Sequence, residues 1–163
     1  AAPAKEILPI DDLLDEATNV IPKEAGESVA VHLDKDLDDL RVTAHRIGLL
    51  QVLGNLVLNA YESIKRAGIA RGEIALEADD AVLEDVQMVR VTVRDNGTGF
   101  DKETGRKIFM RGYTSKKDGD ETGLGLHWCA NAVAGMGGRI FAESDGQGQG
   151  AEFHVLLPAA TKG

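Results

Sequence analysis

The sequence predicts a two-layer α/β sandwich, in which a mixed, mostly antiparallel sheet carries its helices on one face. Three observations support this class: one long amphipathic helical pattern, several short β-branched stretches, and hairpin-like connections between strands in the second half of the chain. A length of 163 residues with 43% hydrophobic residues suits a single core. We therefore expect one domain over residues 1–163, with a disordered end at residues 1–5.

The first half of the chain is expected to form a strand, a helix, two strands and a long helix. Because proline is tolerated at sheet edges, residues 7–10 predict a short edge strand. Asp11 or Asp12 is expected to cap a helix that runs to about Val20, just before Pro22. Alternating apolar and polar side chains predict two further strands, at residues 28–33 and 40–42.

The strongest helical pattern runs from about Ala44 to Ala67, and Gly68 is expected to end it. Its apolar residues recur every three or four positions: Leu49, Val52, Leu53, Leu56, Val57, Ala60 and Ile64. The second half then predicts strands at residues 73–78 and 86–94, an irregular glycine- and charge-rich segment to Thr122, a helix from near Gly123 to Met136, and strands at 139–144 and 151–157.

Composition limits the classes of partner. The net charge of −9 argues against general nucleic-acid binding, which depends on many basic contacts. A single cysteine cannot form an internal disulfide, and no apolar run is long enough to cross a bilayer, so we expect a cytoplasmic domain without membrane contact. A basic stretch at residues 102–117 is the exception in this acidic chain and suits a small polyanion.

Two polar features point to a site. Asn55, Asn59 and Glu62 share one face of the long helix, where amide oxygens suit Mg²⁺ that also binds phosphate. Asp95 follows a strand and leads into Gly97-Thr98-Gly99, so its carboxylate can accept a hydrogen bond from an exocyclic amine.

A third feature is the segment Gly123-Leu124-Gly125-Leu126 at a helix start, which exposes backbone N–H groups that favour phosphate. Neither the P-loop nor the dinucleotide-binding glycine motif is complete, which argues against a P-loop NTPase and a Rossmann dehydrogenase.

In this order and spacing, the motifs resemble the ATP-binding catalytic domain of sensor histidine kinases, within the superfamily that also includes gyrase, Hsp90 and mismatch-repair ATPases. The resemblance covers almost the whole chain and implies the Bergerat-type ATP-binding fold. The matching segments are the N box at residues 51–64, the G1 box at 95–100, the F box at 107–116, the G2 box at 123–127 and the closing G3 segment at 148–153.

The resemblance implies specific roles. Asn59 would coordinate Mg²⁺, Asn55 would contact the phosphates or metal-bound water, and Asp95 would bind the adenine amino group, with residues 101–122 as a lid. Asn55, Asn59 and Lys116 form the implied catalytic set, in which Lys116 contacts the γ-phosphate. The implied nucleotide-binding set is Asn55, Asn59, Glu62, Asp95, Gly97, Gly99, Tyr113, Lys116, Thr122, Gly123, Leu124, Gly125, Leu126 and His127.

The sequence departs from the family pattern at three points. Glu62 stands where many members have lysine, although a subset that resembles nitrogen-regulation kinases has glutamate there. Tyr113 is followed by threonine and serine in place of the frequent arginine, and Ala151 stands where threonine is frequent.

These features predict that the chain binds ATP and Mg²⁺ and donates the γ-phosphoryl group to a histidine outside it. Asn55 stands where hydrolytic relatives have a glutamate base, so efficient attack by water is not expected. The expected partners are a dimerisation and phosphoacceptor helical domain of the same kinase and a response-regulator receiver domain, with the isolated domain a monomer. The alternatives are a nucleotide-binding regulatory module or pseudokinase, and an anti-sigma-type serine kinase; a DNA-dependent ATPase is the least favoured class.

Overall fold

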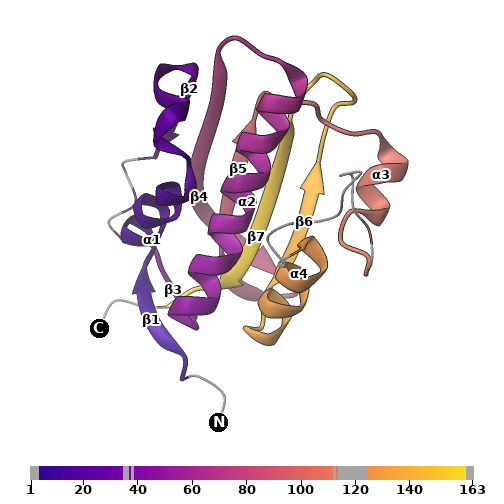
Figure 1. The fold of residues 1–163 in the computed structure, drawn as a ribbon. Coiled ribbons are helices and arrows are strands. Elements are labelled where there is room, and N and C mark those ends of the chain that lie inside the picture. The colour runs from indigo at the N-terminus through magenta and orange to yellow at the C-terminus, as the bar shows by residue number, and fades with distance from the viewer. Residues whose placement is uncertain (1–3, 35–36, 38, 112, 114–124, 161–163) are drawn as a thin grey trace.

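The computed structural model describes residues 4–34, 37, 39–111, 113 and 125–160. Helices lie on one face of a five-stranded sheet, which confirms the predicted two-layer architecture (Figure 1). The elements in chain order are β1 (Glu6–Pro9), α1 (Ile10–Ala17), η1 (Thr18–Val20), η2 (Lys23–Ser28), β2 (Val29–Leu33), β3 (Arg41–Ala44), α2 (Arg46–Ala67), β4 (Gly72–Leu83), β5 (Val86–Asp95), α3 (Lys102–Lys107), α4 (Leu126–Gly135), β6 (Arg139–Glu143) and β7 (Ala151–Pro158).

The main sheet has the order β2-β4-β5-β7-β6. The β2–β4 pair is parallel and the other three pairs are antiparallel, so the sheet is mixed and mostly antiparallel as predicted. A second, two-stranded sheet joins β1 to β3. β5 lies at the centre of the main sheet, and its last residue, Asp95, therefore ends in the interior of the molecule.

The core lies between the main sheet and α2. The apolar stripe predicted for this helix is buried; Leu49, Val52, Leu53 and Leu56 have no exposed surface. Gly68 ends the helix in the left-handed conformation (φ 66°), as expected for a glycine cap. None of the helices in the described part of the chain has the length and apolarity that a membrane crossing requires.

The start of α1 differs from the prediction. Neither Asp11 nor Asp12 caps it; Pro9 is the N-cap, and the two aspartates lie in the first turn, where their charge favours the positive end of the helix dipole. The helix begins at Ile10 because this side chain is completely buried and must turn inward directly after β1. The α-helix ends at Ala17, and the stretch to Val20 is a 3₁₀ turn.

The predicted strand at residues 73–78 was too short. β4 continues to Leu83, because β5 pairs with its acidic second half along the whole length. The connection is a two-residue turn in which Glu84 and Asp85 both have positive φ (50° and 65°), the conformation of a type I′ hairpin turn.

A short helix, α3, occupies part of the segment predicted to be irregular. Asp101 caps it by accepting the backbone N–H of Thr104 (2.8 Å), and Lys107 pairs with Glu103 one turn earlier (3.0 Å). α4 begins at Leu126, with Gly125 as N-cap, whereas the predicted start near Gly123 lies outside the described residues.

Candidate functional site

Asp95 lies at the inner end of β5, with only 6% of its surface exposed. Its Oδ1 accepts the backbone N–H of Gly97 (2.8 Å). Burial raises the pKa of this carboxyl group from 3.8 to about 6, against the opposing effect of hydrogen bonds from the Gly97 and Ala151 backbones and of the charge of Arg66. A buried carboxylate of this kind is costly to hold ionised, and such groups gather at functional sites.

The loop after Asp95 docks against α2. Gly97 lies so close to the helix that a Cβ there would be 2.7 Å from the carbonyl carbon of Ser63 and 2.9 Å from the nitrogen of Ile64. The backbone N–H of Thr98 donates to Oγ of Ser63 (2.9 Å), and the two hydroxyl oxygens are 3.0 Å apart. The loop is therefore fixed to α2 at Ser63.

Asn59 lies four residues, about one helical turn, before Ser63, which is about 6 Å along the α2 axis. Asn55 is one turn earlier still, and Glu62 follows on the same face; all three side chains are half-buried. Among the residues that the structure describes, no hydrogen bond to the Asn59 amide is found. The docking of the loop on Ser63 thus brings the helix that carries Asn55 and Asn59 next to the Asp95 loop.

A second loop, residues 144–150, lies against the first. Ser144 joins them: its hydroxyl donates to the carbonyl of Gly150 (2.6 Å) and accepts the backbone N–H of Phe100 (3.1 Å). Gly150 in turn donates its N–H to the carbonyl of Gly97 (3.2 Å). Gly99 has a positive φ (64°), and a Cβ on it would collide with two backbone carbonyl oxygens of this second loop. Glycine is required there for both conformation and room.

The two segments that flank residues 114–124 are tied together. The rings of Phe100 and Phe109 both pack edge-on against Phe153 of β7, with centroids 6.3 and 6.1 Å away. The Nδ1 atom of His127 in the first turn of α4 lies 3.1 Å from the carbonyl oxygen of Phe109, and its Nε2 lies 3.2 Å from Nδ2 of Asn131. Both ring nitrogens of His127 therefore already have partners.

The structure brings some of the predicted site residues together. Asn55, Asn59 and Glu62 lie on α2, and the loop of Gly97 and Thr98 docks on the same helix at Ser63. Gly125, Leu126 and His127 begin α4, which packs beside α2. Tyr113 is described and half-buried. The remaining four predicted residues lie outside the described residues: Lys116, Thr122, Gly123 and Leu124.

Sequence reasoning missed the residues that assemble the site, Ser63, Ser144 and Phe153. Ser63 carried a usable signal, since it lies four residues after Asn59 and therefore on the same helix face. Ser144 carried none, because the partner that links it to the first loop is a backbone N–H group, that of Phe100, far away in the chain.

An apolar groove of about 470 Å³ runs between α1 and α2. Asn55 lies at its edge, and its lining includes Val20, Leu50 and Leu58. Ile47 in the first turn of α2 is 74% exposed there. The groove is separate from the Asp95 loop and adjoins the asparagine face from the α1 side.

Comparison with known proteins identifies the family to which this chain belongs. A family described as "Histidine kinase-, DNA gyrase B-, and HSP90-like ATPase" matches residues 44–161. Among curated proteins, the sensor histidine kinase ZraS of Salmonella typhimurium is 31% identical over 154 residues, which is 94% of this chain and 31% of that protein. The chain spans less than a third of the length of the curated relatives that it matches most strongly.

Solved structures agree. The catalytic domain of histidine kinase ThkA is 29% identical with a TM-score of 0.77, over 94% of this chain and 95% of that chain. ThkA in complex with the response regulator TrrA has a TM-score of 0.71 at 27% identity, over 96% of this chain and 42% of that chain. Full-length ShkA in complex with AMPPNP has a TM-score of 0.75 at 27% identity, over 99% and 32%. The predicted resemblance to histidine kinase catalytic domains is confirmed.

Proposed function

The chain belongs to the histidine kinase-, DNA gyrase B- and HSP90-like ATPase family, and from that premise we propose that it binds ATP with Mg²⁺ and donates the γ-phosphoryl group to a histidine on a helical partner domain. The observation that carries this proposal is the buried carboxylate of Asp95, in a loop that Ser63 fixes one turn from Asn59.

The Asp95 loop fits adenine by its chemistry. The carboxylate of Asp95 is an acceptor suited to the exocyclic amine of adenine, and burial excludes water that would compete for it. Gly97 and Gly99 leave no side chain on the backbone beside it. A guanine base presents a carbonyl oxygen at the corresponding position, so the same carboxylate should reject it.

The asparagine face of α2 fits a magnesium ion bound to phosphates. The amide oxygen of Asn59 is a hard ligand for Mg²⁺, which keeps several waters and shares oxygens of its substrate. When bound, Mg²⁺ would neutralise charge on the phosphates during transfer. Asn55, one turn earlier, would hold the phosphates or a metal-bound water, and Gly125 and Leu126 would offer backbone N–H groups at the start of α4.

The lid, residues 101–122, is proposed to close over the phosphates. Its described part carries exposed cations on and after α3, at Arg106, Lys107 and Arg111. The contact between His127 and the Phe109 carbonyl would hold the base of the lid in place, so we propose that His127 positions the lid and leaves phosphate contacts to Lys116 and the backbone of residues 122–126.

The reaction that this arrangement supports is transfer to a protein acceptor. Asn55 carries an amide, which cannot take a proton from water, so the site lacks a general base at the position where hydrolytic relatives have glutamate. Phosphoryl transfer depends mainly on positioning and charge neutralisation, and both come from the groups above. The nucleophile would come from the phosphoacceptor helical domain, and the phosphoryl group would pass on to a response-regulator receiver domain.

We place the phosphoacceptor domain on the apolar groove between α1 and α2. The groove adjoins Asn55, so a helix seated there would lie next to the phosphates. The exposed side chains of Ile47 and Val20 suit the apolar face of such a helix.

Calorimetric titration of the chain with ATP and GTP, each with Mg²⁺, tests the adenine assignment. We expect ATP to bind at least tenfold more tightly than GTP, and we expect the preference to shrink in Asp95→Asn, whose amide can donate to the guanine carbonyl. Equal affinity for the two nucleotides would refute the assignment.

A further inference from the structure

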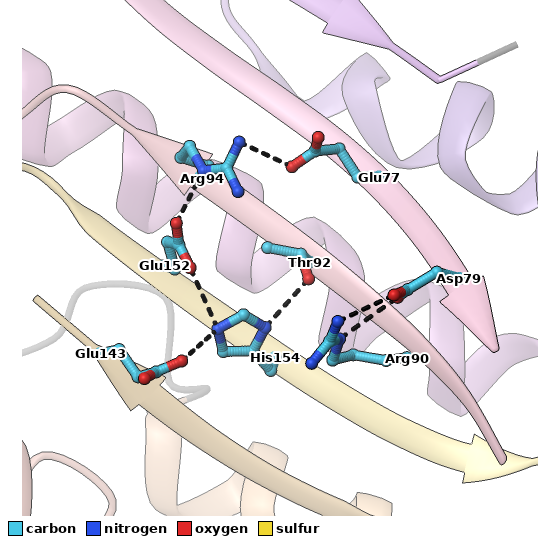
Figure 2. Close-up of polar contacts among 8 residues, drawn as sticks. All are labelled: Glu77, Asp79, Arg90, Thr92, Arg94, Glu143, Glu152 and His154. Atoms are coloured by element: carbon cyan, nitrogen blue, oxygen red, sulfur yellow. Dashed lines mark hydrogen bonds and ion pairs between the residues drawn. The ribbon is translucent and has the colours of Figure 1, made fainter. Parts of the chain in front are cut away.

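The sheet face opposite the helices carries a polar cluster that the nucleotide site does not use. It consists of Glu143 on β6 and Glu152 and His154 on β7, and we call it the His–Glu cluster (Figure 2). Phe153 and Val155 of β7 point into the core, so Glu152 and His154 face the other side of the sheet. Glu143 lies opposite Glu152 in the β6–β7 ladder, which brings the two carboxylates together.

His154 is almost completely buried, at 4% exposure, although it lies on the face that the helices leave open. Its Nε2 atom is 2.9 Å from Oε1 of Glu143 and 3.3 Å from Oε1 of Glu152. Despite these distances, Nε2 forms no hydrogen bond with any described residue, because neither oxygen lies along the ring's N–H direction. A buried polar atom thus points between two carboxylates without a satisfied bond, which is costly unless something else satisfies it.

A metal ion between the three groups would account for this geometry. Zinc lies about 2.0–2.1 Å from a histidine nitrogen and about 2.0–2.2 Å from a carboxylate oxygen. Two such ligands are then about 2.9 Å apart at a right angle at the metal, and about 3.4 Å apart at the tetrahedral angle. The observed separations from Nε2, 2.9 and 3.3 Å, fall in this range. If a carboxylate oxygen lay on the Nε2 bond direction at this distance, it would occupy the space that a metal ion needs. The two oxygens lie off that direction, so the space remains.

The surroundings of His154 suit a metal ligand. Nδ1 lies 2.9 Å from Oγ1 of Thr92, also buried, so a proton held on Nδ1 leaves the lone pair of Nε2 for a metal. The ring of Phe141 stacks on the imidazole, with centroids 4.7 Å apart, and fixes its orientation.

Glu152 is oriented in the same way. The Nε atom of Arg94 donates to Oε2 of Glu152 (2.8 Å), which leaves Oε1 directed at His154 (Figure 2). Arg94 is itself held by Glu77 of β4 (2.9 Å). These contacts form an outer shell that supports the two β7 ligands.

We propose that Glu143, Glu152 and His154 bind a divalent transition-metal ion of the zinc class. An imidazole nitrogen favours such an ion over Mg²⁺, and the two carboxylates complete a set that zinc accepts. The Glu143 side chain is 65% exposed, so water can fill the remaining coordination position. The bound ion would join the edge strand β6 to β7 on the face away from the nucleotide, and this inference does not depend on the proposed function.

Zinc titration of the chain without a histidine tag, after chelator treatment and without nucleotide, tests the proposal. We expect one Zn²⁺ per chain by calorimetry and a Tm that rises by several degrees with zinc. Glu143→Gln should weaken zinc binding at least tenfold and leave the zinc-free Tm nearly unchanged, because the side chain is exposed. Asp79→Asn is the matched control, since it removes a carboxylate from the same sheet face that pairs with Arg90 (2.8 Å) and holds neither a ligand nor Arg94.

Cobalt(II) provides a second readout, because a bound Co²⁺ ion absorbs visible light according to its ligands. We expect a ligand-field band in the wild-type chain and in Asp79→Asn, and loss of that band in Glu143→Gln. Absence of zinc binding at millimolar concentration would overturn the proposal and leave the His154 ring in contact with the two glutamates alone. Zinc binding that Glu143→Gln leaves unchanged would also overturn it, since the ion would then occupy another site.

Discussion

Replacing Asp95 by asparagine should stabilise the nucleotide-free fold while it weakens ATP binding. The carboxyl group has a pKa of about 6 in the folded chain and 3.8 as the ordinary value, a difference of about two pH units. At about 1.4 kcal/mol per unit, the ionised carboxylate costs the folded chain about 3 kcal/mol once the pH is well above 6. Asparagine avoids this cost but replaces one of the two acceptor oxygens by an NH2 donor, so we count one of the hydrogen bonds from the Gly97 and Ala151 backbones as lost. Losing one such bond offsets about 1 kcal/mol, which leaves a net gain of about 2 kcal/mol.

The sign of the pH dependence follows from the raised pKa. Because the folded chain holds this proton more tightly than the unfolded chain, the stability that the carboxyl group provides is fully present below about pH 4. It is lost as the pH rises toward 6 and beyond. At pH 5 only about half of the cost has developed, so the advantage of Asp95→Asn should be about 1.5 kcal/mol smaller at pH 5 than at pH 8.

Urea unfolding of both proteins at pH 5 and pH 8, without nucleotide, measures this difference. Asp80→Asn, an exposed aspartate on β4, serves as the matched control and should change little with pH. In Asp95→Asn, the free energy of ATP binding at pH 8 should weaken by about 1–3 kcal/mol, because the charged acceptor is lost. A variant that is less stable than the wild type at pH 8, or equally affected at both pH values, would refute the burial argument for Asp95.

Three further changes test other parts of the site. Gly97→Ala should lower the free energy of unfolding by about 1–3 kcal/mol and weaken ATP binding, because the new Cβ collides with the α2 backbone. Thermal unfolding and calorimetry measure the two effects. Gly135→Ala is the control and should show neither loss, because a Cβ there has no neighbour within 4 Å. Asn59→Ala should remove the Mg²⁺ dependence of ATP binding and keep the fold; calorimetry with Mg²⁺ or with chelator checks this, and retained dependence would exclude Asn59 as the ligand. Ile47→Asp should leave ATP affinity unchanged and reduce phosphotransfer in the full-length protein at least tenfold. Val82 is an exposed valine outside the groove, and an equal loss of phosphotransfer in Val82→Asp would argue against the groove as the docking site.

The architecture was predictable because it follows from periodicity. The three- and four-residue spacing of apolar side chains specifies α2, and the alternation in β5 and β7 specifies a sheet with one buried face. Ends of elements were less predictable, since they depend on tertiary contacts. α1 begins where Ile10 must be buried, and β4 is long because β5 pairs with it from Ile74 to Leu83.

The short helix α3 was missed because Gly105 lies inside it and helix propensity alone disfavours that residue. The structure supplies the reason for the glycine: the ring of Phe100 packs against it, and a Cβ would be 3.0 Å from that ring. The cap formed by Asp101 and Thr104 was the local signal that outweighed the glycine.

The chemistry of the candidate site was predicted better than its assembly. Asn55, Asn59 and Asp95 stood out because amides inside an apolar helix and an acid between a strand and glycines need a reason. The docking of the loop on Ser63 and the tie through Ser144 join segments far apart in the chain, so no local pattern announces them. The same holds for His154, whose approach to Glu143 depends on the pairing of β6 with β7.

Labelling with γ-phosphate-labelled ATP tests the central proposal most directly. The full-length protein that contains this chain should acquire a phosphoryl group that is acid-labile and base-stable, as phosphohistidine is, and Asn59→Ala should abolish the label while the protein remains folded. Acid-stable label would instead indicate a serine kinase. ATP binding without any label on the protein would contradict phosphoryl donation and leave a nucleotide-binding regulatory module.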